Sequence, residues 1–230
     1  MDNQFSAFNH KPNNIILLAG ILLAFMIPLG LTIWIGDATM SYYDKLFYSR
    51  FFYWGTVVFL LFYALKAERQ PLLIVTESKP GVGFFLQSVL VLYLLFIAAA
   101  IVSAIPALLG WHEDNAMVKK ITELLKGHQA MLFFIALTAG VTEEFIFRGY
   151  VLTRLTQLFK NPAIAVIVSS LLFSALHYKY GSLHELLFAF LIGVIFSVYY
   201  LKYRNIKALM LTHFLIDFIN MNLAQHIKLK

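Results

Sequence analysis

Long apolar runs constrain what this chain can fold into more than any other feature of its sequence. A transmembrane helix needs about 20 predominantly apolar residues, with roughly 17–25 tolerated. The expected spans lie at residues 14–35, 51–65, 82–109, 130–152, 162–177, 185–201 and 206–223. The sequence therefore predicts an all-α fold, a polytopic transmembrane helix bundle of about seven spans.

The composition supports a membrane protein and excludes several kinds of chemistry. Of the 230 residues, 60% are hydrophobic and only 13% are charged, whereas about 25% are charged in soluble domains. The chain has no cysteine, which excludes disulfides, thiolate metal sites and a cysteine nucleophile. The net charge of +6 is typical of basic loops beside anionic headgroups. We expect no nucleic-acid partner, because there is no soluble domain to carry a basic face.

The polar segment 111–128 is the one substantial connection between the predicted spans. Its Met117, Ile121 and Leu124 fall at helical spacing and predict an amphipathic helix at the membrane surface. We interpret this helix as a connector without a role in chemistry. Accordingly, we divide one integral membrane domain into N-terminal spans with the connector (1–129) and a catalytic helical core (130–223).

Location and orientation follow from the same pattern. Lysine and arginine are divided almost equally between the two sides, which favours a cytoplasmic N-terminus only slightly. We expect a multi-pass integral membrane protein of the plasma membrane, which is the inner membrane if the source is bacterial. We assign His184 and Glu185, at the start of a span, to the membrane interface.

Ionisable residues inside the later spans are the candidates for a functional site. A charge in the middle of a span costs about 2.5–3.5 kcal/mol on insertion scales, so such residues are functional candidates by default. They come from three separate spans: Glu143, Glu144 and Arg148 from the fourth, His177 from the end of the fifth, and His213 and Asp217 from the seventh. Left unpaired, they would cost on the order of 10 kcal/mol in lipid, so we expect them to meet one another or water.

Helix geometry indicates which of these side chains can meet. Glu144 and Arg148 lie four residues apart on one helix face, which predicts an ion pair. Glu143 points about 100° away from Glu144, so it is free to face another group. His213 and Asp217 repeat the four-residue spacing and place a carboxylate beside an imidazole.

The depth of these residues in the membrane gives a second test. Residues 160–162 (Lys-Asn-Pro) predict a tight break before a new helix. If the fourth helix continues to this break, an antiparallel hairpin sets Glu143 and His177 at equal depth. His213 and Asp217 would then lie roughly 10 Å nearer that face, at about 1.5 Å per residue. Each candidate also has a structural interpretation, as a buried ion pair, a helix-end histidine or a hydrogen bond between helices.

These residues belong to three motifs, which occur in the order Glu143-Glu144-x-x-Phe147-Arg148-Gly149, Phe173-x-x-x-His177 and His213-x-x-x-Asp217. Together the motifs resemble the signature of the CAAX-protease and bacteriocin-processing (CPBP, or Abi) family of intramembrane endopeptidases. The resemblance covers roughly residues 130–222. The N-terminal spans carry no motif.

The resemblance implies a role for each residue of the fourth and fifth spans. Glu143 would be the general base that activates a water molecule, and His177 would help to position that water. Glu144 and Arg148 would brace the site.

For the seventh span, the resemblance implies that His213 and Asp217 stabilise the tetrahedral oxyanion. An oxyanion needs donors, but an ionised aspartate only accepts hydrogen bonds. Some relatives carry asparagine where this chain has Asp217. Either Asp217 is protonated or it orients His213, which would then be the side-chain donor, and we favour the second arrangement.

The resemblance leaves the cofactor open, because the family has long been described as metallopeptidases. Two histidines and Glu143 could supply three ligands to zinc with one open position. No HExxH motif occurs, since His184-Glu185 is followed by Leu, Leu and Phe. We favour a metal-free, glutamate-activated water and no cofactor, with a divalent metal such as zinc as the alternative.

The sequence therefore predicts a hydrolase, an intramembrane endopeptidase that acts on a membrane-associated protein or peptide in the lipid bilayer. One alternative is a non-catalytic membrane scaffold or immunity protein of the same fold. Another is an ion- or proton-coupled transporter, although the sequence shows no inverted repeat. The sequence indicates neither the oligomeric state nor whether the substrate is prenylated.

Overall fold

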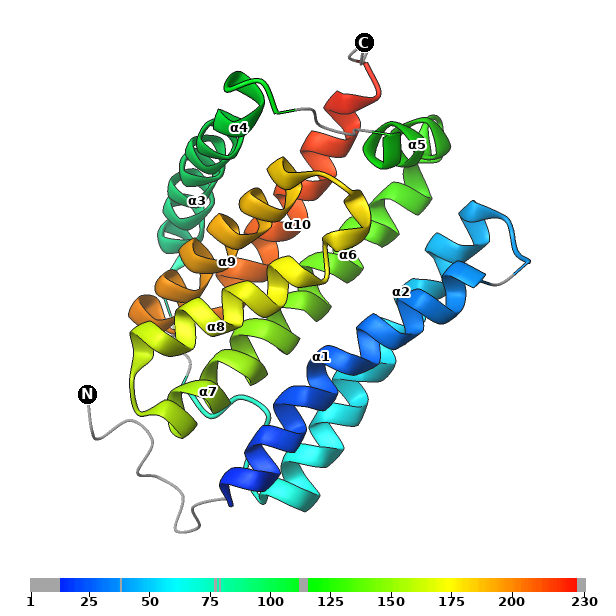
Figure 1. Ribbon diagram of the computed structural model, residues 1–230. Coiled ribbons are helices and arrows are strands. Elements are labelled where there is room, and N and C mark those ends of the chain that lie inside the picture. The colour runs from blue at the N-terminus through cyan, green and yellow to red at the C-terminus, as the bar shows by residue number, and fades with distance from the viewer. Residues whose placement is uncertain (1–12, 38, 77, 79, 112–115, 227–230) are drawn as a thin grey trace.

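The computed structural model describes residues 13–37, 39–76, 78, 80–111 and 116–226, which form a helical bundle without a β-strand (Figure 1). In chain order the elements are α1 (Asn14–Asp37), α2 (Tyr42–Tyr63), η1 (Ala64–Glu68), α3 (Val82–Ser103), α4 (Ile105–Leu108), α5 (Ala116–Leu125), α6 (Gln129–Glu144), η2 (Phe145–Val151), α7 (Leu152–Phe159), α8 (Pro162–Ala175), η3 (Tyr178–Tyr180), α9 (Leu183–Tyr203) and α10 (Ile206–Ala224).

Within these residues, six helices are long and apolar enough to cross a membrane: Tyr42–Glu68, Val82–Leu108, Gln129–Phe159, Pro162–Tyr180, Leu183–Tyr203 and Ile206–Ala224. A shorter apolar helix, Asn14–Gly30, lies within α1. The predicted all-α polytopic bundle of about seven spans is confirmed. The second span was predicted too short, because its helix continues through polar residues at both ends, from Tyr42 to Glu68.

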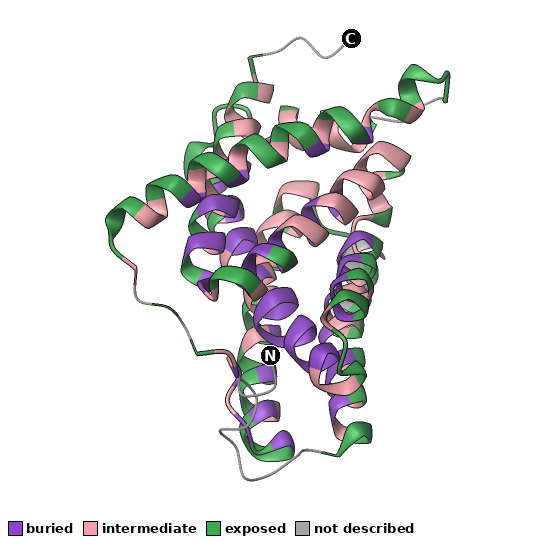
Figure 2. Ribbon diagram, turned by 90° about the vertical axis from the view of Figure 1, so that its left-hand side faces the viewer, coloured by how far each residue is buried: buried purple, intermediate pink, exposed green. Residues whose placement is uncertain are grey.

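One central helix organises the bundle. Elements α6, η2 and α7 form a continuous helix from Gln129 to Phe159, the most buried of the six. Buried residues are concentrated at the centre of the bundle (Figure 2). The π-helical turn η2 (Phe145–Val151) begins directly after Glu144, and such turns within α-helices often occur at functional sites.

Asparagine caps begin two of the helices that carry the predicted site. The side chain of Asn161 accepts hydrogen bonds from the amides of Ala163 and Ile164 at 3.0 and 3.3 Å, at the start of α8. Asn205 caps α10 in the same way, through the amide of Ala208 at 2.8 Å. These bonds satisfy backbone donors that have no partner within the helix.

Small residues let the helices of the C-terminal half approach closely. Helix α6 packs on α10 and α8 packs on α9. A methyl group added to Gly140 of α6 would lie 2.7 Å from the backbone nitrogen of Phe214 on α10. One added to Gly193 of α9 would lie 2.8 Å from the side chain of Ser170 on α8. The two glycines therefore fix the distance between the helices that carry the site.

A buried ion pair joins the α1–α2 hairpin to the central helix. Glu68 of η1 accepts from both Nε and Nη2 of Arg154 on α7, at 3.1 and 2.8 Å, and both side chains are fully buried. The hydroxyl of Tyr150 and the amide of Gln70 also donate to Glu68, at 2.6 and 3.0 Å. The sequence had given no indication of this pair, whose members are 86 positions apart.

Candidate active site

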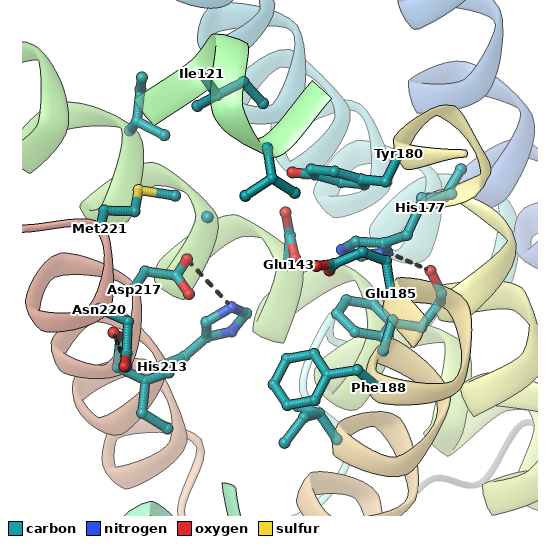
Figure 3. Close-up of a pocket in the computed structure, with 18 of the residues that line it drawn as sticks. Ile121, Glu143, His177, Tyr180, Glu185, Phe188, His213, Asp217, Asn220 and Met221 are labelled. Atoms are coloured by element: carbon teal, nitrogen blue, oxygen red, sulfur yellow. Dashed lines mark hydrogen bonds and ion pairs between the residues drawn. The ribbon is translucent and has the colours of Figure 1, made fainter. Parts of the chain in front are cut away.

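A cavity of about 400 Å³ lies among α2, α5, α6, α8, α9 and α10. Glu143 of α6, His177 at the end of α8, and His213 and Asp217 of α10 all line it. Glu143 lies between His177 on one side and the His213–Asp217 pair on the other (Figure 3).

Residues from three helices thus converge on one cavity, although His213 and Asp217 were expected to lie nearer one face of the membrane than Glu143 and His177. The α7–α8 junction projects beyond the α9–α10 junction (Figure 1), which offsets the difference in depth.

Glu144 and Arg148 lie behind the wall of the cavity rather than in it. Both side chains are buried, and Arg148 Nη1 donates to Glu144 Oε1 at 2.9 Å, as the four-residue spacing predicted. The guanidinium carbon of Arg148 lies 4.6 Å from the ring centre of Phe173 and 5.3 Å from that of Phe196. The ion pair and the aromatic faces together compensate a charge that would be costly in an apolar interior.

His213 is held by Glu144 rather than by the residue one turn away. Its Nδ1 lies 2.7 Å from Glu144 Oε1, which is a hydrogen bond. Its Nε2 lies 3.6 Å from Asp217 Oδ2, too far for a hydrogen bond but close enough for an ion pair. Because a carboxylate accepts, Nδ1–H is the donor to Glu144. The orienting role that the sequence assigned to Asp217 therefore falls to Glu144 in this geometry.

His177 is oriented by the backbone of its own helix. Its Nδ1 lies 2.9 Å from the carbonyl oxygen of Phe173, and a carbonyl only accepts, so Nδ1 carries the proton. This bond leaves Nε2 of a neutral imidazole as an acceptor. The ring also lies parallel to that of Tyr180, with centres 5.8 Å apart. His177 therefore presents one defined nitrogen to a ligand or a water molecule.

Other cavity residues lie outside the motifs and were not singled out from the sequence. Arg50 and Tyr53 of α2 and Tyr180 of η3 line the cavity. Glu185, which was assigned to the membrane interface, also lines it. The available signal for Arg50 was a basic residue at the edge of an apolar run, a pattern that equally fits a side chain reaching the interface.

The predicted connector helix lies at the site. The structure has α5 at Ala116–Leu125, packed against α6 and η3, while residues 112–115 of the predicted segment lie outside the described part. Its Val118, Ile121 and Thr122 line the cavity (Figure 3). The apolar face of this helix therefore packs toward the cavity, and the interpretation of the helix as a connector without a role in chemistry stays a prediction.

The site does not fit a metal ion with three protein ligands. Across the part of the chain that the structure describes, no three histidine, aspartate or glutamate side chains are placed to share one. Nδ1 of His213 and Nδ1 of His177 are both hydrogen-bonded, so only their Nε2 atoms are available to a ligand. We therefore derive no catalytic step through a metal.

The bundle and its cavity define a polytopic membrane protein with a buried site of carboxylates and imidazoles. Residues 127–219 match the family model described as Rce1-like, type II CAAX prenyl endopeptidase Rce1-like. This match confirms the predicted resemblance to the CAAX-protease (CPBP) family over the C-terminal segment, and it supports a CAAX-type intramembrane endopeptidase in general. Neither a curated protein nor a solved structure matches the chain.

Proposed function

We propose that this protein is an endopeptidase that hydrolyses a peptide bond of a membrane-associated protein or peptide, with Glu143 as the general base. One observation carries the proposal. Glu143 lines the cavity between two imidazoles, and no hydrogen bond or ion pair to the described residues occupies its carboxylate. A carboxylate with this freedom is available to a water molecule.

The proposed reaction begins with a water molecule between Glu143 and His177. Glu143 takes a proton from the water, and Nε2 of His177 accepts a hydrogen bond that fixes its position. The water oxygen attacks the carbonyl carbon of the peptide bond and forms a tetrahedral intermediate. Glu143 then gives the proton to the amine nitrogen as the C–N bond breaks, which releases a carboxylic acid and an amine.

The oxyanion of the intermediate would face His213. For Nε2 to donate to it, His213 must carry protons on both ring nitrogens, because Nδ1–H already donates to Glu144. Glu144 and Asp217 lie on either side of the ring and supply compensating negative charge. Donors placed where negative charge develops typically contribute about 10²–10³-fold to the rate. Asp217 then acts by balancing charge.

The walls of the cavity fit a substrate that reaches the site from the bilayer. Phe96, Phe188, Ile192 and Phe196 form an apolar wall next to the polar groups. Such a wall suits apolar segments of a membrane-bound peptide, and it suits a lipid chain equally well. We therefore propose a membrane-associated substrate in the plasma membrane, without assigning a prenyl group.

Cleavage of a membrane-peptide library by the purified protein, with and without chelator, tests the proposal. We expect Glu143→Gln to abolish cleavage, whereas Glu123→Gln, which changes an exposed glutamate of α5 outside the cavity lining, should cleave as the wild type does. We expect activity to survive the chelator. Equal cleavage by Glu143→Gln and wild type would refute Glu143 as the base, and no cleavage by the wild type would leave a scaffold of the same fold.

A further inference from the structure

Three arginines lie within the membrane-competent helices of the described chain, and one differs from the others. Arg148 pairs with Glu144, and Arg154 pairs with Glu68. Arg50 of α2 has no carboxylate within ion-pair distance among the residues that the structure describes. Its printed contacts are a hydrogen bond from Nε to Ser49 Oγ at 3.1 Å and the ring of Tyr53, 5.1 Å from the guanidinium carbon.

Arg50 is nevertheless a lining residue of the cavity that holds Glu143, His177 and His213. Asp217 lines the same cavity, but it forms no ion pair with Arg50. A cation at membrane depth is costly unless it faces water or finds a partner. The forked guanidinium of arginine matches a carboxylate through two parallel hydrogen bonds. The cavity thus presents a cation that has no carboxylate within ion-pair distance among the described residues.

We propose that Arg50 is a specificity-determining residue that binds a carboxylate of the substrate peptide. This inference rests on the proposed function, because it assumes that a peptide enters the cavity. The carboxylate is supplied either by the free C-terminus of the peptide or by an acidic side chain. Both sources offer the same chemistry to the guanidinium.

The size of the cavity limits how far this carboxylate lies from the cut. Arg50 and Glu143 both line the same cavity of about 400 Å³. Because an extended chain spans about 3.3–3.6 Å per residue, the selected carboxylate is only a few residues from the scissile bond.

The test compares matched versions of one peptide that the wild-type protein cleaves. One version has a free C-terminus and another has a C-terminal amide, and a third replaces acidic residues near the cut by their amides. Hydrogen bonds to charged groups contribute about 1.5–3 kcal/mol, so the wild type should favour the carboxylate that Arg50 binds by roughly 10- to 100-fold in kcat/KM. The modified peptide that the wild type cleaves with lower kcat/KM identifies the source of the carboxylate.

Variants then assign the preference to Arg50. In Arg50→Gln the preference should disappear, mainly through a higher KM for the acidic peptide, so that the acidic and the fully amidated peptides are cleaved with similar kcat/KM. Arg50→Lys should keep part of the preference, because it keeps the charge but loses the fork. Lys66→Gln, which changes an exposed basic residue of the same long helix outside the cavity lining, should behave as wild type.

The outcomes separate this inference from the proposed function. Equal cleavage of all peptide versions by the wild type overturns the role of Arg50, as does an equal loss on every version in Arg50→Gln. If Arg50→Gln does not fold, the role of Arg50 is decided by how the wild type and Arg50→Lys cleave the different peptide versions. When cleavage depends on Glu143 but not on the carboxylate, only the inference fails. When no peptide is cleaved, both fail, and when Glu143→Gln cleaves as wild type does, only the assignment of Glu143 as the base fails.

Discussion

The two adjacent glutamates of the site have opposite environments, and the geometry of one helix explains why. Successive residues of an α-helix point about 100° apart. Glu143 therefore faces the cavity without a hydrogen-bond or ion-pair partner among the described residues, whereas Glu144 is buried between Arg148 and His213. The same side chain can be a reactive group at one position and a structural anchor at the next.

This division predicts that the two glutamates differ in their effect on stability. Glu144→Gln leaves the buried charge of Arg148 without its counterion, which should cost about 3–5 kcal/mol of unfolding free energy. Glu143→Gln removes no contact and should change stability by less than about 1 kcal/mol. Unfolding of the purified variants in detergent, followed by tryptophan fluorescence, measures both values. Equal losses in the two variants would contradict the assignment.

His177 can be tested by keeping its ring and removing its nitrogens. His177→Phe preserves an aromatic ring against Phe173 and Tyr180 but removes the acceptor that would hold the water. We expect the rate of cleavage to fall by about 10²–10⁴-fold, the usual contribution of a positioned acid–base group, with little change in stability. Tyr180→Phe, which keeps the neighbouring ring, serves as the control. A His177→Phe protein with normal turnover would remove His177 from the mechanism.

At the scale of the helices, close packing through glycine positions the site. Gly140→Ala would place its methyl group 2.7 Å from the backbone nitrogen of Phe214 and 3.0 Å from the carbonyl oxygen of Met210. Backbone atoms of α10 cannot yield without moving His213, so we expect a loss of about 1–3 kcal/mol together with reduced activity. In contrast, Gly55→Ala on α2 meets nothing within 4 Å, and it should be neutral or stabilise by up to about 1 kcal/mol. Denaturation and cleavage assays on both variants provide the measurement.

The spans were predictable from sequence because lipid requires long apolar helices, a requirement that local composition records directly. Their ends were less predictable. The second helix continues to Glu68 and the central helix continues to Phe159 because Glu68 and Arg154 neutralise each other across the bundle. No local pattern encodes a partner 86 positions away.

In the site, too, contacts within one helix were predictable from sequence, whereas contacts between distant helices were not. The pair Glu144–Arg148 lies within one helix turn, so its spacing predicted the contact that the structure contains. The hydrogen bond between Glu144 and His213 joins residues 69 positions apart, and it depends on how α6 packs against α10. Spacing alone therefore favoured Asp217 as the partner of His213. Arg50 was not singled out from the sequence. What distinguishes it is the lack of an ion-pair partner among the described residues, which depends on how the helices pack.

At the scale of the whole molecule, the lining of the cavity includes residues outside the segment that matches the family model. The family model covers residues 127–219, yet Arg50, Tyr53, Phe96 and Ile121 also line the cavity. The N-terminal spans therefore supply part of the wall against which a substrate would lie. The division into N-terminal spans (1–129) and a catalytic core (130–223) stays a prediction, and the shared cavity shows that the two parts meet at one site.

The buried pair Glu68–Arg154 should be the interaction that holds these two parts together, and a double-mutant cycle tests this. Removing one member leaves the other charged and buried, so Glu68→Gln and Arg154→Met should each cost about 3–5 kcal/mol. The double variant removes both charges and should be no less stable than either single variant, because the orphaned charge is gone. Unfolding free energies of the four proteins in detergent give the coupling. Additive losses would show that the two residues act independently, and the position of the α1–α2 hairpin against the central helix would then depend on other contacts, such as apolar packing and the hydrogen bond from Trp54 Nε1 to Thr138 Oγ1 at 3.3 Å.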